Sequence, residues 1–154
     1  MTNKSSRKMS LAERVKKKRT DDLWPEDIAA GEGEVPPITI LKQQASLLGR
    51  RTRNLIEAEV ETGTSDYQRF LRHTLFLVAP ALNFYRHALL EVEHDATKLY
   101  PATIKASRSR NGSSKQQTLR AKNSNEFKKA LKEVFADDET KKTIGSLLAQ
   151  SGAN

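Results

Sequence analysis

Pro80 lies in the middle of the most apolar stretch of the chain and limits how that stretch folds. Apolar residues within 67–92 recur alternately four and three positions apart, which is the spacing of a helix. A proline inside a helix removes a backbone hydrogen bond and costs about 3 kcal/mol or more. The alternative is a turn of helix at 65–71 followed by strands at 74–79 and 86–94, with Pro80 in the connection between the strands. Because of Pro80 we favour the strands, and a mostly α fold with a proline-kinked central helix stays as the alternative.

The segments on either side of this stretch complete an α+β pattern. Within 55–62, Ile56, Ala58 and Val60 alternate with glutamates, which is the period-two pattern of a half-covered strand. After residue 123 the apolar positions return to helical spacing behind a capping asparagine or serine. The predicted fold is an antiparallel sheet of about four strands flanked by an early helix and C-terminal helices. The strands are expected at 55–62, 74–79, 86–94 and 99–106, and the helices at 38–48, from 123–125 and from 137–138.

The charges of the 154-residue chain are distributed unevenly, and this distribution predicts its domain organisation. The formal net charge is +8, but residues 1–19 hold eight Lys or Arg and one acid, whereas 20–34 hold six acids and no Lys or Arg. The two prolines after Val35 favour an extended backbone and exclude a continuing helix. We therefore predict a disordered leader over 1–34, basic and then acidic, and a single domain over 35–154.

A second basic segment lies inside the domain. Residues 107–123 carry five Lys or Arg and no acid, and their polar composition predicts a mobile loop. Clustered cations favour a polyanionic partner because they release condensed counterions when they meet phosphates. The segment has no aromatic residue on which a base would stack, so its contacts are expected with phosphates.

The leading functional hypothesis is a non-catalytic module that associates with nucleic acid through contacts that do not depend on base sequence. The candidate contact residues are Lys16, Lys17, Lys18, Arg19, Arg50, Arg51, Arg53, Arg108, Arg110, Lys115, Arg120 and Lys122.

A second hypothesis is a protein-interaction or assembly component. Leu23, Trp24 and Ile28 stand in the acidic part of the leader, and sparse apolar anchors of this kind let a disordered segment dock on a partner. The competing interpretation is that Trp24 packs on its own domain. An open sheet face would offer another binding surface, and a homodimer is compatible with it. Tyr85 beside Arg86 combines a ring and a cation that suit a phosphate or a base, against core packing of the ring.

Motifs for catalysis, cofactors and metals are absent, so no enzyme, no cofactor and no metal is predicted. Cysteine does not occur, and neither do a phosphate-binding glycine loop, a Gly-x-Ser-x-Gly elbow or an HExxH motif. His87 and His94 are seven positions apart and would point to opposite faces of a strand, which excludes a shared metal. A remote alternative is a small metal-dependent hydrolase or nuclease that assembles its site from Glu57, Glu59 or His94.

The chain shows no sign of export or of insertion into a bilayer. No apolar segment follows the first cations, so a secretory signal peptide is not expected. The longest apolar run, Leu75 to Leu82, is far shorter than the roughly 20 residues that cross a bilayer. We therefore predict a cytoplasmic protein without a membrane span.

Overall fold

The computed structural model describes residues 20–31, 33–65, 67–110 and 113–153, with side chains for all of these except 108–110 and 113–114. The chain divides into two units, Met1–Glu32 and Gly33–Asn154, and each is described by itself. In the first unit the described residues form no helix or strand. The disorder expected of the leader stays a prediction.

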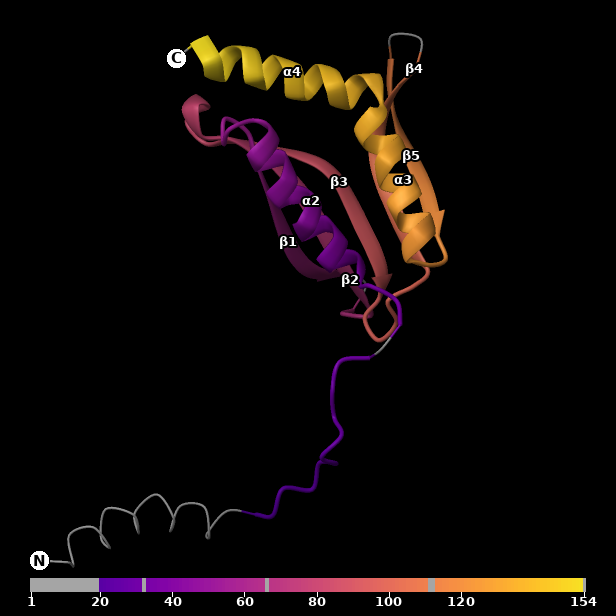
Figure 1. Cartoon of the computed structure of the whole chain (residues 1–154). Coiled ribbons are helices and arrows are strands. Elements are labelled where there is room, and N and C mark those ends of the chain that lie inside the picture. The colour runs from indigo at the N-terminus through magenta and orange to yellow at the C-terminus, as the bar shows by residue number, and fades with distance from the viewer. Residues whose placement is uncertain (1–19, 32, 66, 111–112, 154) are drawn as a thin grey trace, which may run out of the picture. The chain divides into compact units, whose positions relative to one another are not determined.

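The second unit is an α+β structure built on a five-stranded antiparallel sheet. Its strands lie side by side in chain order, β1-β2-β3-β4-β5 (Figure 1). The predicted fold class is confirmed, with one strand more than expected. The helices are α2 (Pro37–Arg51), α3 (Ser124–Ala136) and α4 (Asp138–Ala153), and the strands are β1 (Glu57–Ser65), β2 (Phe70–Ala79), β3 (Tyr85–Asp95), β4 (Ala102–Arg110) and β5 (Ser113–Ala121).

Pro80 ends β2 and begins a short 3-10 turn, η1 (Pro80–Leu82). In the first position of a helical turn the missing N–H has no bond to lose, and the fixed φ of proline suits the turn. Asn83 then adopts a left-handed backbone with φ of 58°, which helps the chain to reverse into β3. The strands favoured for 74–79 and 86–94 are confirmed as parts of β2 and β3, and the helical alternative is wrong.

The turn of helix expected at 65–71 is wrong, because the chain makes a tight hairpin there. Ser65 pairs with Phe70 at the end of the β1–β2 ladder. Tyr67 and Gln68, between them, both have positive φ, 55° and 66°. Residues 66–69 connect this last pair, and positive φ at two consecutive residues of a hairpin connection matches the twist of the flanking strands. Strand pairing on both sides therefore overrides the local preference of these two residues.

The interpretation of 107–123 as a loop is also wrong. Strands β4 and β5 pair over their whole length, from Ala102 with Ala121 to Arg110 with Ser113. A polar strand at the edge of a sheet needs apolar residues on one side only, and β5 has few of them. Its structure depends on hydrogen bonds to β4 and on the helix that covers it, neither of which is local in sequence.

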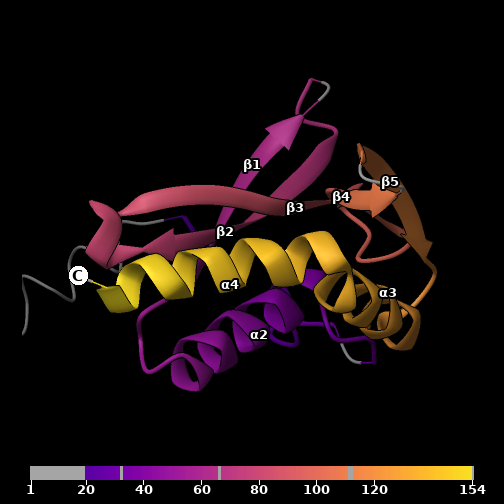
Figure 2. The same cartoon turned by 90° about the horizontal axis from the view of Figure 1, so that it is seen from above.

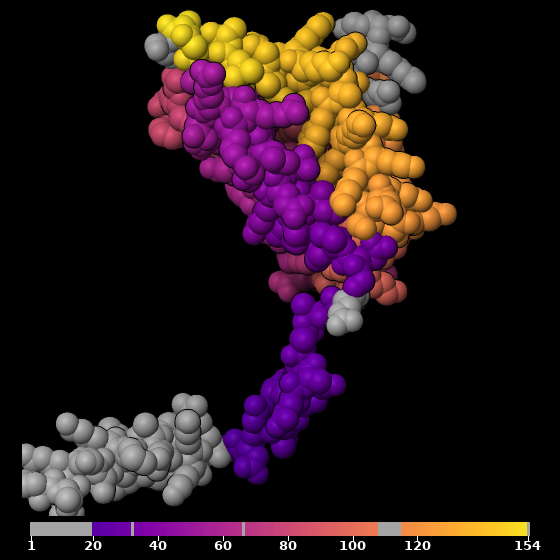
Figure 3. Space-filling view, in the orientation of Figure 1, coloured from indigo at the N-terminus to yellow at the C-terminus, as the bar shows by residue number. Residues whose placement is uncertain are grey.

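All three helices lie on one face of the sheet, which we call the covered face (Figure 2). They hide most of the sheet in the space-filling view of Figure 3. The core lies between these layers and includes buried Leu77 and Val92 from the strands. The helices contribute buried apolar side chains from each of the three, namely Ile40, Leu41, Phe127, Leu131 and Leu147. The other side of the sheet, the open face, is covered by none of the helices α2, α3 and α4.

Helix α3 begins where the sequence predicts it. Asn123 is the N-cap, and its side-chain oxygen accepts a hydrogen bond of 2.9 Å from the backbone N–H of Glu126. The Glu126 carboxylate in turn accepts from the backbone N–H of Lys122 at 2.9 Å. These bonds satisfy donors that a helix start leaves unpaired. The cap therefore holds the start of α3 against the end of β5.

Two hydrogen bonds attach the beginning of the second unit to the rest of it. The Tyr100 hydroxyl donates to the carbonyl of Val35 at 2.7 Å, and the backbone N–H of Ser124 donates to the Glu34 carboxylate at 2.9 Å. Burial raises the pKa of Tyr100 to about 12, so its hydroxyl keeps its proton at ordinary pH.

Candidate nucleic-acid interface

Helix α3 packs against β5, and both elements carry exposed cations. We call their exposed side chains the β5–α3 surface: Lys115, Arg120, Lys122, Lys128, Lys129 and Lys132. None of the six forms an ion pair with another residue in the described ranges. Segment 115–133 holds only two acids, Glu126 and Glu133, and Glu126 is engaged by the helix cap. Arg120 projects from the open face of β5, whereas Lys115 and helix α3 lie on the covered side. The cations therefore surround this edge of the sheet and are accessible to a polyanion.

Half of this surface could not be assigned from the sequence. Lys115, Arg120 and Lys122 were predicted as nucleic-acid contacts. The three lysines of α3, Lys128, Lys129 and Lys132, were not, because exposed lysines are ordinary on the polar side of an amphipathic helix. Their association requires that β5 exists as a strand and that α3 lies against it. The available signal was the short distance in sequence between Lys122 and Lys128.

The opposite edge of the sheet carries the opposite charge. Strand β1 holds Glu57, Glu59 and Glu61, and no Lys or Arg. The guanidinium of Arg86 forms ion pairs with Glu59, at 3.4 Å, and with Glu61. Its central carbon lies 4.1 Å from the centroid of the Phe76 ring, a cation–π arrangement. The glutamates of β1 are thus partly neutralised within the sheet.

A second arginine pairs across the open face in the same way. Nη2 of Arg72 lies 3.3 Å from Oε2 of Glu93, and its Nε lies 3.9 Å from Oε2 of Glu91.

Tyr85 and Arg86 do not form the joint ring-and-cation site considered from the sequence. Arg86 is on the open face, whereas the Tyr85 side chain lines a cleft beneath α4 on the covered side.

The arginines at the end of α2 belong to a different part of the molecule. Arg50 and Arg51 occupy the last turn of α2, where cations interact favourably with the helix dipole. Arg53 follows in the turn that leads to β1. Figures 1 and 2 both place this end of α2 away from β5, although α2 covers the same face of the sheet as α3. The predicted contact residues therefore do not form one surface.

The structure does not place every candidate. Arg108 and Arg110 lie on β4, but their side chains are outside the described set. The four cations of the leader are in the part of the chain that is not described, namely Lys16, Lys17, Lys18 and Arg19.

The apolar anchors of the leader are described and exposed. Trp24 is 77 % exposed, and Leu23 and Ile28 are exposed as well. The backbone N–H of Trp24 donates to the Asp22 carboxylate at 3.0 Å, which shapes a local turn.

A buried pair of histidines, His73 of β2 and His94 of β3, was missed from the sequence. Both lie on the covered face, 2 % and 5 % exposed, with their Nε2 atoms 2.9 Å apart. Nδ1 of His94 is 2.8 Å from the carbonyl oxygens of both Asp95 and Lys98, so this nitrogen carries a proton. In the neutral pair His94 then accepts at Nε2 from His73, whose Nδ1 accepts from the Thr62 hydroxyl at 2.8 Å.

This chain of hydrogen bonds fits a structural link rather than an acid–base site. The pKa of His73 is lowered to about 4, mainly by burial and to a smaller extent by the nearby charges of His94 and Lys42. Two imidazolium rings would place N–H against N–H at the shared contact, so the pair holds at most one added proton. The rings join β1, β2, β3 and the turn after β3.

The prediction that His87 and His94 point to opposite faces is wrong because of a β-bulge. The pairing of β2 with β3 shifts between Leu75 and Phe76, which adds one residue to β3. Both histidines then lie on the covered face, and His94 is bound to His73. Among the described residues, no group of three or more His, Cys, Asp or Glu is placed to hold a metal ion.

The residues of the hydrolase alternative do not come together either. Glu57 and Glu59 are exposed on β1, whereas His94 is buried on the covered face.

Comparison of the chain with protein-family models, curated proteins and solved structures finds no match. No helix in the described ranges is long and apolar enough to cross a membrane. A function must therefore be argued from the surfaces themselves.

Proposed function

We propose that the protein is a cytoplasmic, non-catalytic module that binds nucleic acid through its phosphates, using the β5–α3 surface. The observation that carries this proposal is the contrast between the edges of the sheet. The six cations of the β5–α3 surface have no ion pairs among the described residues, whereas Arg72 and Arg86 are paired with glutamates. Unpaired like charges repel one another in the free protein, and a polyanion would relieve that repulsion.

The expected binding is electrostatic and sensitive to salt. Each cation that meets a phosphate of a duplex releases condensed counterions, so the affinity falls as salt rises. With all six cations engaged, log Kobs would fall against log salt with a slope of about −5. Lysines predominate on this surface, and lysine acts on phosphate as a point charge rather than as a two-pronged donor to a base edge. Binding without sequence preference is the consequence.

Fluorescence anisotropy with labelled DNA and RNA at about 50 and 200 mM salt tests the proposal. The full chain is compared with K128E/K129E/K132E, which reverses the three cations of α3. The matched control is K42E/R69E/K98E, which makes the same change in net charge at exposed positions outside this surface. We expect the α3 variant to lose at least a hundredfold in affinity and the control to lose much less. Equal losses would reduce the effect to net charge and contradict the proposed surface.

A second candidate function is docking on a protein partner through the leader. The exposure of Leu23, Trp24 and Ile28 supports it, because large apolar side chains at interfaces supply much of the binding energy. Trp24→Ala should abolish capture of such a partner and leave the salt-dependent affinity for nucleic acid nearly unchanged. A large loss of nucleic-acid affinity in Trp24→Ala would instead assign the tryptophan to the first function.

A further inference from the structure

Two connections meet at one end of the sheet, although they are far apart in sequence. The first residue of β1, Glu57, pairs with Val78, and Ala79 pairs with Tyr85 at the start of β3. The turn between α2 and β1 and the η1 connection therefore lie beside each other, as Figures 1 and 2 show. The C-terminal half of α4 reaches the same end and contacts η1.

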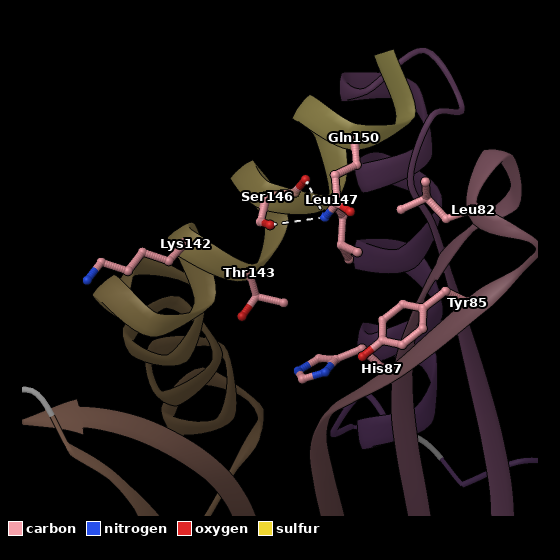
Figure 4. Close-up of a pocket in the computed structure, with 8 residues that line it drawn as sticks. All are labelled: Leu82, Tyr85, His87, Lys142, Thr143, Ser146, Leu147 and Gln150. Atoms are coloured by element: carbon pink, nitrogen blue, oxygen red, sulfur yellow. Dashed lines mark hydrogen bonds between the residues drawn. The ribbon is translucent and has the colours of Figure 1, made fainter. Parts of the chain in front are cut away.

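An open cleft of about 550 Å³ lies between this end of the sheet and α4. Leu82, Tyr85 and His87 line it from the sheet side, and Lys142, Ser146 and Gln150 line it from α4 (Figure 4). None of its lining residues is acidic. In volume it falls within the roughly 300–1,000 Å³ of small-molecule sites, and it offers both an apolar wall and hydrogen-bonding groups.

One exposed aromatic ring, that of Tyr85, borders the cleft. Tyr85 is 49 % exposed although its ring borders the cleft, and its neighbour Phe84 is 67 % exposed. Large aromatic side chains gain free energy from contact with another flat ring, and nucleobases present such rings when they are unpaired. The β5–α3 surface has no comparable ring, because Phe127 is buried and Phe135 packs against the core.

Cations stand at the same end. Arg50, Arg51 and Arg53 are exposed and form no ion pair with the described residues, and Lys142 lies at the rim of the cleft. A single-stranded nucleic acid needs cations along its backbone and aromatic platforms for its bases. This end of the sheet supplies both.

We propose that this end of the domain binds unpaired nucleobases of single-stranded nucleic acid. A base stacks on Tyr85 at the mouth of the cleft, polar groups of α4 contact its edge, and Arg50, Arg51 and Arg53 contact the flanking phosphates. The inference rests on the proposed function and adds a preference to it. Bases in a duplex are already stacked, so this site favours single strands whereas the β5–α3 surface accepts either form.

The test removes the ring and retains apolar bulk. Tyr85→Leu is compared with Tyr85→Phe, which keeps the ring, and with Tyr67→Ala, which removes a fully exposed tyrosine from the hairpin at the opposite end of β1 and β2. The probes are labelled oligo-dT and a duplex of the same length. We expect Tyr85→Leu to lose about tenfold or more in affinity for the single strand and to keep its affinity for the duplex. Tyr85→Phe and Tyr67→Ala should both bind as the natural protein does.

The outcomes separate failure of this inference from failure of the proposed function. Salt-sensitive binding that K128E/K129E/K132E abolishes and Tyr85→Leu leaves intact would overturn the base site alone. No binding of either probe would overturn both. Thermal unfolding checks the variants, and if Tyr85→Leu does not fold, Lys142→Glu on the exposed side of α4 should give the same selective loss. If equimolar thymidine monophosphate displaced oligo-dT, the site would bind a free nucleotide as well as it binds a strand. That result would overturn the proposal that its ligand is single-stranded nucleic acid.

Discussion

The strands β1 to β3 and the segment from β5 to α3 belong to one sheet-based unit, yet their charges are arranged differently. All four ion pairs among the described residues join Arg72 or Arg86 to glutamates of β1 and β3. The β5–α3 surface has six exposed cations and none of these pairs. Charge in the first region is paired within the fold, whereas charge in the second is unpaired among the described residues, and we propose that a polyanion neutralises it. Changes in the first region should therefore alter stability, and changes in the second should alter binding.

The largest expected effect is on stability and belongs to the histidine pair. The pKa of His73 is lowered to about 4 in the folded protein, below the usual 6.5, so the unfolded chain binds the proton more readily. The stabilisation is present above about pH 6.5 and is lost as the pH falls toward 4, by up to about 3 kcal/mol. Urea unfolding at several pH values should show this loss.

The matched variants are His73→Gln, which cannot take up the proton, and His87→Gln, which removes the partly exposed histidine of β3. His73→Gln should flatten the pH dependence in this window, and His87→Gln should retain it. An equal slope in His73→Gln and the natural protein would assign the effect to other groups. Affinity for nucleic acid in His73→Gln at neutral pH should not change, which separates the two regions.

The next effect is on binding and belongs to the edge strand. Arg120→Ser with Lys122→Ser removes two cations from the β5–α3 surface and should lower the affinity for duplex DNA about tenfold at low salt. The slope of log Kobs against log salt should become shallower by about 2. Both side chains are exposed, so the melting temperature should stay the same. A large drop in melting temperature with unchanged affinity would reverse the comparison between the two regions.

A smaller effect on stability is expected at Arg86. Arg86→Ala removes exposed ion pairs with Glu59 and Glu61 and the stacking on Phe76, and should lower the midpoint of urea unfolding slightly. High salt should reduce this shift, because the pairs are exposed. Nucleic-acid affinity should stay within about twofold, and a tenfold fall would show that Arg86 meets the ligand despite its pairing.

The smallest effect is expected for a single lysine of α3. Lys129→Ala should change the free energy of unfolding by less than about 0.5 kcal/mol, since the side chain is exposed and alanine favours helix. Affinity should fall by a few-fold at low salt and hardly at all at high salt. A stability loss above about 1 kcal/mol would mean that Lys129, like Arg72 and Arg86, makes contacts that stabilise the fold.

Sequence reasoning succeeded where the signal is local. The alternation of Ile56, Ala58 and Val60 predicted β1, Pro80 excluded a central helix, and Asn123 marked the start of α3. It failed at β5, whose polar residues resemble those of a loop until β4 supplies the hydrogen bonds. The surfaces followed the same division, because the individual cations were recognisable but their grouping was not.

The sequence by itself determined the α+β class, the excess of positive charge and the helix starts, because periodicity, proline and capping act within a few residues. Only the tertiary structure decided which cations lie on neighbouring elements, that Arg72 and Arg86 are paired with glutamates, and that Tyr85 and the arginines at the end of α2 lie at the same end of the sheet. It also brought His73 and His94 together, 21 residues apart in the chain, by the pairing of β2 with β3. Hydrogen bonds between strands and the packing of helices on them join residues that no local pattern connects, and in this protein those contacts create both surfaces proposed to bind nucleic acid.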